Sequence, residues 1–570
     1  MRRFSALLAV LVFGSLPLCA QQPASAIDQV LDRVVAQEKE QVKLIRGYSP
    51  LVETYIQMLA PDKALGTVPN GDKYFLGRAK MENGVQMVSL ATGEANGGKK
   101  GFLGGLFSGS MEFIPEGFLQ MVYIDADGFD RQNYQFDYVR REFLGEVRAL
   151  VFDVVPKNKN EQGRFAGRIW VEDQDFHVVR FNGAYTGSKR GSLYFHFDSW
   201  RVNTEKNMWL PALIYSEETD IRFALSTKVM FKAQTRLWGY NLGAAKQEQE
   251  LSKILIESAM PVHDETTTAR DISPLQAQRS WDRQAEDNVV DRMERLGLLA
   301  PSGEVDKVLE TVVNNLEVTN NLDIQPGVRC RVVMTSTLEA FTIGHTIVLS
   351  RGLVDVLPDE PSLAAVIAHE LSHAVLGHRI DTQYAFFDRM LFDDQETFRH
   401  FGFARTPEEE TAATAKAAVL LANSPYKDQL GTAQKFVQAL TNRSKQIPNL
   451  ISPHLGNTVL TRWTPGALPV PAAPAQPTTV AAAPAPEDPN LIVALPLGGR
   501  IKLDPWDDQL TMLKSKPVGA VAEREKMPFE VTPFILFLTR SEGVSINQTP
   551  GAVSAQSKTA DPIDSPTQPR

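Results

Sequence analysis

The sequence is poor in cysteine, with only Cys19 and Cys330 among its 570 residues. Cys19 lies at the end of an N-terminal segment that has the features of a cleaved signal, so Cys330 would stand alone in the mature chain. A single cysteine cannot form an internal disulfide, and stability must therefore come from other sources such as hydrophobic cores. Cys330 lies in a strand-like run, residues 330–334, where we expect a buried small hydrophobic side chain rather than a nucleophile.

The sequence also lacks a strong charge bias and a long internal apolar run. The formal net charge of -9 is modest and spread along the chain, which gives no indication of a nucleic-acid partner. Beyond the N-terminus no stretch approaches the roughly 18 apolar residues that a membrane-spanning helix needs, and residues 533–538 are far too short. We therefore expect a soluble mature chain without a membrane span.

The first twenty residues are typical of a secretory signal peptide. Arg2 and Arg3 form the charged end, residues 4–18 form the apolar stretch, and Cys19-Ala20 provides small residues for cleavage before Gln21. The mature protein is therefore expected to be exported. Lipoprotein anchoring at Cys19 is the alternative, although the bulky residue just before this cysteine fits such a signal poorly.

The composition changes along the chain and predicts an α+β multidomain fold. Residues 26–59 show helical spacing of apolar residues, whereas residues 117–240 contain short runs rich in aromatic and β-branched residues that predict strands, the first of them at 118–124. We expect a helix and an antiparallel β domain over residues 21–260. Runs 152–156, 167–172 and 178–181 resemble the curved sheet of outer-membrane lipoprotein-carrier proteins. That resemblance implies a groove for lipid or an apolar segment, and a β domain with a filled core is the alternative.

A mainly helical domain is expected over residues 261–463. Its first helix, residues 264–298, should bury a stripe formed by Trp281, Val289, Met293 and Leu296. Beyond this domain we expect a Pro/Ala-rich linker at 464–490, a small segment at 491–540 that could add strands to another domain, and a disordered tail at 541–570.

The sequence His369-Glu370-Leu371-Ser372-His373 is the strongest indication of chemistry. Residues 363–376 contain no proline or glycine and have apolar residues at helical spacing, so the motif lies on a helix. His369 and His373 are then about 40° apart on one helix face and both can reach a single ion. Zinc favours imidazole ligands and activates water, and Glu370 is placed to act as the general base in amide hydrolysis.

A third protein ligand must come from elsewhere in the chain. The metzincin class of zinc proteases has a histidine six residues after the second one, but this position is Arg379, and Leu376 replaces the expected glycine. His378 would lie about 140° round the helix from His373. We therefore expect it to interact with the carbonyl groups at the helix end rather than with a metal.

A longer stretch resembles the zinc metallopeptidase family that includes CAAX prenyl proteases, heat-shock membrane proteases and soluble periplasmic chaperone-proteases. The resemblance spans residues 305–463 and rests on the runs 305–309, 339–341, 344–353, 359–360, 365–373 and 377–378. It implies a gluzincin-type domain holding one Zn²⁺, with His369, His373 and Glu410 as ligands. Glu408 and Glu409 are rivals for the third position. Thr414 stands where the family has an aspartate, which puts full activity in doubt.

The resemblance also implies how the site would be used. A single strand over residues 342–350 would be the edge on which an extended polypeptide substrate pairs. His454 is a candidate for stabilising the transition state, and residues 386–403 are a candidate lid, with ordinary packing as the alternative. An exported, periplasmic endopeptidase acting in envelope protein quality control is the leading hypothesis. The alternative is a lipid- or polypeptide-binding chaperone module with a vestigial peptidase site.

Overall fold

The computed structural model describes most of the chain between residues 26 and 540. The predicted signal peptide with Cys19, the linker at 464–490 and the tail at 541–570 lie outside the described residues. The described ranges are 26–63, 66–90, 113–158, 160–187, 195–223, 227–240, 274–386, 393–452, 454–458, 497–498, 500–503, 508–512 and 529–540.

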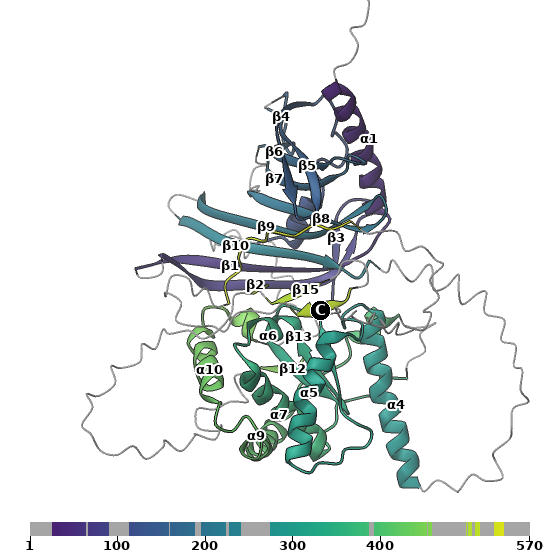
Figure 1. The fold of residues 1–570 in the computed structure, drawn as a ribbon, viewed down its shortest axis with the longest axis vertical. Helices are drawn as coiled ribbons and strands as arrows, with labels where there is room; N and C mark the ends of the chain where they lie inside the picture. Colours follow the sequence, from purple (N-terminus) through teal and green to yellow (C-terminus); the bar gives the residue numbers. More distant parts are fainter. Residues whose placement is uncertain are drawn as a thin grey trace, which may run out of the picture.

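The first half of the molecule is built on one ten-stranded antiparallel sheet with the strand order β3-β2-β1-β10-β9-β8-β7-β6-β5-β4. Its strands are β1 (Leu51–Asp62), β2 (Gly66–Lys80), β3 (Gln86–Ser89), β4 (Tyr134–Leu144), β5 (Val147–Pro156), β6 (Phe165–Glu172), β7 (Val178–Tyr185), β8 (Phe197–Glu205), β9 (Met208–Phe223) and β10 (Thr227–Trp238). The second half is mainly helical (Figure 1). The predicted α+β class is confirmed.

Two local predictions were wrong in this half. The helix expected over residues 26–59 ends at Arg46 as α1 (Ala26–Arg46), and β1 follows at Leu51. The β-branched and aromatic side chains around Tyr55 gain more from pairing between β2 and β10 than from helix. The strand expected at 118–124 is instead helical, as α2 (Pro115–Leu119) and the 3-10 helix η1 (Gln120–Val122), because Pro115 favours a helix start.

Side chains fill the inner face of the sheet. α1 lies against this face (Figure 1) and contributes Leu31, Val34, Val42 and Ile45 to a buried cluster that also includes α2, η1 and many strand residues. Glu38 of α1 is fixed by a buried two-bond ion pair with Arg201 of β8, at 2.6 Å and 2.7 Å. Within the described residues, this face is therefore a packed core.

The opposite face is partly covered by residues 529–540. Leu538 joins a cluster with Trp170, Trp200 and Trp209, and its carbonyl accepts the backbone N–H of Glu146 at 2.9 Å. Glu530, at the other end of the segment, lies 3.6 Å from the ammonium of Lys232. The alternation at residues 530–538 had suggested that this part of the chain could add strands to another domain, but residues 529–540 form no strand. The hairpin β15 (Ile501–Leu503) and β16 (Leu510–Met512) forms a small sheet of its own.

The second half packs helices around a four-stranded sheet with the order β11-β13-β12-β14. Its strands are β11 (Arg329–Val333), β12 (Glu339–Ile343), β13 (Thr346–Ser350) and β14 (Asn457–Thr458). Its helices are α4 (Pro274–Arg295), α5 (Glu304–Thr319), α6 (Arg351–Val356), α7 (Glu360–Leu376), α8 (Asp394–Phe398), α9 (Pro407–Ala422), α10 (Gly431–Arg443) and α11 (Pro448–Ile451). Cys330 of β11 is buried as predicted, and burial raises the pKa of its thiol.

The two halves share one hydrophobic core and buried polar contacts. Leu51, Tyr55 and Trp238 of the large sheet belong to the same cluster as the residues around α7. Glu53 of β1 accepts hydrogen bonds from the backbone N–H and the hydroxyl of Ser336, at 2.6 Å and 2.7 Å. These contacts place the large sheet directly on the helical half (Figure 1).

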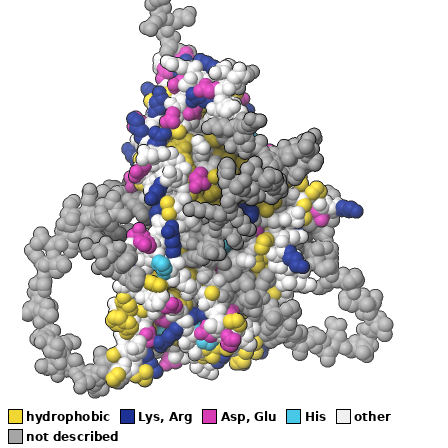
Figure 2. Space-filling model, turned by 180° about the vertical axis from the view of Figure 1, so that it is seen from behind, with side chains coloured by type: hydrophobic (Ala, Val, Ile, Leu, Met, Phe, Trp, Pro, Cys, Tyr) yellow, Lys and Arg dark blue, Asp and Glu magenta, His cyan; other side chains and the backbone are white. Residues whose placement is uncertain are grey.

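The surface agrees with a modest net charge. On the face drawn in Figure 2, cationic and anionic side chains are interspersed among the described residues. None of the described helices is long and apolar enough to cross a membrane.

The predicted stripe of α4 was wrong in one residue: Val289, Met293 and Leu296 are buried, but Trp281 is 59% exposed. The ring of Trp281 instead packs at a tilt against Phe386, with ring centroids 4.3 Å apart.

Candidate metal centre

The helix α7 is defined by signals at both ends. The carboxylate of Asp359 accepts the backbone N–H of Ser362 at 3.0 Å, and Pro361 occupies the first turn. Gly377 ends the helix in the left-handed region at a φ of 71°, which favours glycine. Between these caps lie His369, Glu370 and His373, each about 1% exposed. The predicted helix is confirmed, and the motif is buried within it.

The helix α9 carries the acidic group that faces these histidines. Thr406 and Glu409 form a capping box, in which the carboxylate of Glu409 accepts the backbone N–H of Thr406 at 3.1 Å. Glu408 is exposed, whereas Glu410 is buried. A carboxylate oxygen of Glu410 lies 3.1 Å from Nε2 of His369, and the other lies 3.6 Å from Nε2 of His373. Among the three neighbouring glutamates, the structure thus brings Glu410 to the histidines.

The three side chains form a donor set that suits zinc. The two Nε2 atoms of His369 and His373 are 3.2 Å apart. All three donor atoms lie within 4.8 Å of one another, and theirs is the one such group found among the described residues. In a tetrahedral site with metal–ligand bonds of about 2.0–2.1 Å, neighbouring donors are about 3.3 Å apart. Two imidazoles and a carboxylate at this spacing fit the three protein ligands of a catalytic zinc site.

The protonation of His373 is compatible with this role. Burial lowers the pKa of His373 to about 4, and the nearby His369 and Arg405 act in the same direction against the carboxylates of Glu370 and Glu410. The imidazole is therefore neutral near pH 7 and offers its lone pair, as a metal ligand must.

Glu370 is held beside the donor set by β12. The hydroxyl of Thr342 donates to a carboxylate oxygen of Glu370 at 2.7 Å. The single strand predicted over residues 342–350 was wrong, because Gly344, at a φ of 56°, turns the chain back and separates β12 from β13. Thr342 is therefore the second-last residue of β12, and it contacts Glu370 of α7.

The backbone of Thr342 points away from β13. Residues two apart in an antiparallel strand direct their backbone groups to the same neighbour. Ala340 pairs with Asn457 of β14, and within the described residues β14 extends no further along β12 than this pair. Thr342 thus presents its backbone on the side where β14 has ended.

Arg405 lies at this edge and was not identified from the sequence. Its guanidinium donates to the carbonyl oxygen of Thr342 at 2.6 Å. Burial lowers its pKa, while Glu370, Glu409 and Glu410 favour its charged form. Two residues earlier, Phe403 stacks on Phe341 with centroids 4.7 Å apart. The segment leading into α9 is thus packed along β12. Residues 387–392 of the predicted lid lie outside the described part of the chain.

His378 has a different partner from the one predicted. Its Nδ1 lies 2.8 Å from Nδ1 of His373, the ring nitrogen opposite the one that faces Glu410. As predicted, His378 lies outside the donor set, but its side chain meets His373 because Gly377 ends the helix and turns His378 back toward the preceding turn. A residue that fixes the second nitrogen of a ligating imidazole sets its tautomer and ring orientation.

Two further residues are placed by the structure. His454 lies outside the three-residue donor set: its Nε2 is 3.1 Å from the carbonyl oxygen of Asn449, and its ring stacks on Tyr74 at 4.4 Å. Thr414, in place of an acidic residue, donates its hydroxyl to the carbonyl oxygen of Glu410 one turn earlier on α9, at 2.8 Å. The contacts of His454 with Asn449 and Tyr74 do not place it at the pair formed by His369 and His373.

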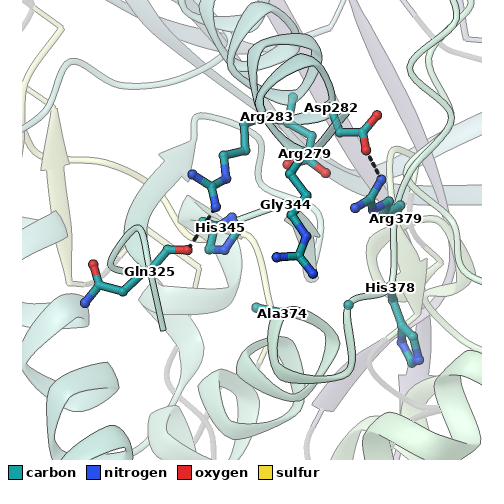
Figure 3. A pocket seen from close by; sticks show the side chains of 11 residues that line it. Arg279, Asp282, Arg283, Gln325, Gly344, His345, Ala374, His378 and Arg379 are labelled. Atoms are coloured by element: carbon teal, nitrogen blue, oxygen red, sulfur yellow. Dashed lines mark hydrogen bonds and ion pairs between the residues drawn. The ribbon is translucent and has the colours of Figure 1, made fainter. Parts of the chain in front are cut away.

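A polar cavity of about 270 Å³ adjoins the site. It lies between α4, the turn after β12 and the end of α7 (Figure 3). Its lining residues are Arg279, Asp282, Arg283, Glu286, Gln325, Gly344, His345, Ala374, Gly377, His378 and Arg379. The cavity and the donor set therefore share the last turn of α7.

Comparison with known proteins finds one similarity, which covers about a quarter of the chain. Residues 300–444 match the sequence model of peptidase family M48. The matched region includes α7 with its two histidines and α9 with Glu410. No curated protein sequence matches the chain.

Proposed function

We propose that this chain is a zinc-dependent endopeptidase. The premise is the match of residues 300–444 to peptidase family M48, a family of zinc metallopeptidases. In this proposal His369, His373 and Glu410 hold one zinc ion and Glu370 is the general base. The observation that carries it is the convergence of two imidazole nitrogens and a carboxylate within 4.8 Å beside the carboxylate of Glu370.

The chain's own residues supply positioning and proton transfer. A bound zinc ion supplies Lewis-acid activation of water and of the amide carbonyl. Glu370 takes a proton from the attacking water and then delivers it to the leaving amine. Thr342 holds this carboxylate in place through its hydroxyl. His378 fixes the ring of His373 from the opposite side.

Endopeptidase action is supported by the part of the β12 edge beyond Ala340, where β14 no longer pairs with it among the described residues. An extended polypeptide can pair with the backbone of Thr342, directly above Glu370, without needing a chain end there. Arg405 occupies the Thr342 carbonyl in this structure, so a substrate strand would have to displace or share that contact.

Export and a role in envelope quality control rest on the sequence. The predicted signal over residues 1–20 supports a periplasmic location, with lipid anchoring at Cys19 as the less favoured alternative. The filled inner face of the large sheet gives no support to lipid carriage by the described residues.

The test compares metal content and cleavage in matched variants. Glu370→Gln should retain zinc and lose at least about a hundredfold in peptide cleavage, because the general base is removed. Glu410→Gln should lose zinc, while Glu408→Gln, an exposed neighbour on the same helix, should keep both zinc and activity. Unchanged cleavage by Glu370→Gln, or normal zinc content in Glu410→Gln, would overturn the proposal.

A further inference from the structure

The polar cavity beside the metal centre has an excess of positive charge that the proposed chemistry does not use. Arg279 and Arg283 lie one turn apart on α4, and Figure 3 shows both side chains extending from the helix into the cavity. Arg379, on the other wall, forms an ion pair with Asp282. Because Asp282 pairs with Arg379, the guanidinium groups of Arg279 and Arg283 have no acidic partner within this set of four charged residues.

The contacts of the two remaining arginines support this account. Arg283 donates to the carbonyl oxygen of Gln325 at 3.3 Å, a neutral partner that leaves its charge in place. Arg279 has neither a hydrogen-bond nor an ion-pair partner among the described residues, and it is exposed.

Glu286 is the second acidic residue that lines the cavity, and its carboxylate packs against the turn after β12. A Cβ atom at Gly344 would lie only 1.9 Å from its carboxylate oxygen, so the carboxylate is packed directly against the turn. Burial raises its pKa, which weakens its ability to neutralise both arginines.

The cavity lies on the path of a substrate bound at β12. Gly344 follows Thr342 by two residues and lies in the turn directly after the end of β12. A polypeptide paired with Thr342 would therefore bring a residue about two positions from the scissile bond to the mouth of the cavity. His378 joins the two places, since it lines the cavity and contacts His373.

We propose that this cavity is a substrate subsite that binds a carboxylate of the polypeptide through Arg279 and Arg283. The inference rests on the proposed peptidase function and adds a substrate preference to it. The carboxylate has two sources, an Asp or Glu side chain near the scissile bond or the C-terminal carboxylate of a short substrate. Both present the planar, charged acceptor that guanidinium groups bind well.

The test uses fluorescent peptides in the full-length zinc-loaded protein. One series carries Glu or Gln at successive positions around the cleavage site with an amidated C-terminus, and a second series has neutral side chains with a free or amidated C-terminus. Cleavage is measured in the wild type, and equilibrium binding is measured in Glu370→Gln. We expect a preference of about three- to fivefold for the carboxylate at one position.

Charge reversal then identifies the cation responsible. Arg279→Glu should abolish or reverse the preference, whereas Arg295→Glu, an exposed change on the same helix outside the cavity lining, should leave it intact. The inference is overturned if peptides are cleaved or bound without a carboxylate preference, or if the preference survives Arg279→Glu. Loss of the proposed function looks different, because Glu370→Gln would then cleave as well as the wild type or zinc would be absent.

Discussion

The buried ion pair between α1 and the large sheet should dominate the stability of that half of the molecule. Glu38 is 1% exposed and Arg201 is fully buried, and the pair makes two short hydrogen bonds. Glu38→Gln removes one charge and leaves the guanidinium of Arg201 buried without its counter-ion. Breaking such a pair from one side costs about 3–5 kcal/mol in the free energy of unfolding.

Urea denaturation followed by tryptophan fluorescence can measure this loss, because Trp200 adjoins Arg201 and Trp209 lies in the same cluster. With a dependence of about 2–3 kcal/mol per molar urea, the unfolding midpoint should fall by about 1–2.5 M. The matched control is Glu40→Gln on the same helix, whose Lys43 pair is 69% and 67% exposed. Its midpoint should move by less than about 0.3 M.

An equal midpoint for Glu38→Gln and Glu40→Gln would refute the reasoning and would mean that α1 is not anchored by this pair. The double replacement Glu38→Leu with Arg201→Met provides a further check. It removes both charges and should recover most of the lost stability, since apolar side chains can replace a buried pair.

Other predictions concern the metal centre. Thr342→Val should lower kcat by about tenfold or more with little change in KM or zinc content, because Glu370 loses a charged hydrogen bond; Thr346→Val on β13 is the control. His378→Ala should weaken zinc binding by about 10–100-fold in a chelator competition, whereas His196→Ala, just before β8 of the large sheet, should not. In the zinc-free protein, His373 has a folded-state pKa of about 4 against 6.5 unfolded, so the unfolded chain takes up the proton first. Its contribution should therefore destabilise the fold progressively as the pH falls from about 6.5 to 4, and His373→Asn should flatten the pH dependence of the melting temperature in that window.

Local signals explain why the motif helix was predictable and parts of its surroundings were not. The Asp359 cap, Pro361 and an apolar helical period are all present within α7, so its place follows from neighbouring residues. The contact of His378 with His373 depends on the left-handed conformation of Gly377, which reverses the chain where a helical wheel assumes that it continues.

Long-range contacts were beyond a reading of the sequence by periodicity. Residues 51–59 carry a mixture of apolar and polar residues that suits either helix or strand, and pairing with β10, encoded about 180 residues later, selects the strand. Arg405 had no sequence pattern that marked it, because its partner is a backbone carbonyl on β12. The sharing of one core by the two halves could not be anticipated for the same reason.

The segment at residues 529–540 has a consequence for the order in which the molecule assembles. The side-chain amide of Gln57, on the interior strand β1, donates to the carbonyl oxygen of Phe529 and accepts the backbone N–H of Val531. These two partners lie 472 and 474 residues later in the chain. At a synthesis rate of about 5–20 residues per second, these partners emerge roughly 25–95 seconds after Gln57. The large sheet therefore spends most of translation with an incomplete outer face. Any protein that shields this face during translation would have to dissociate before residues 529–540 could bind there.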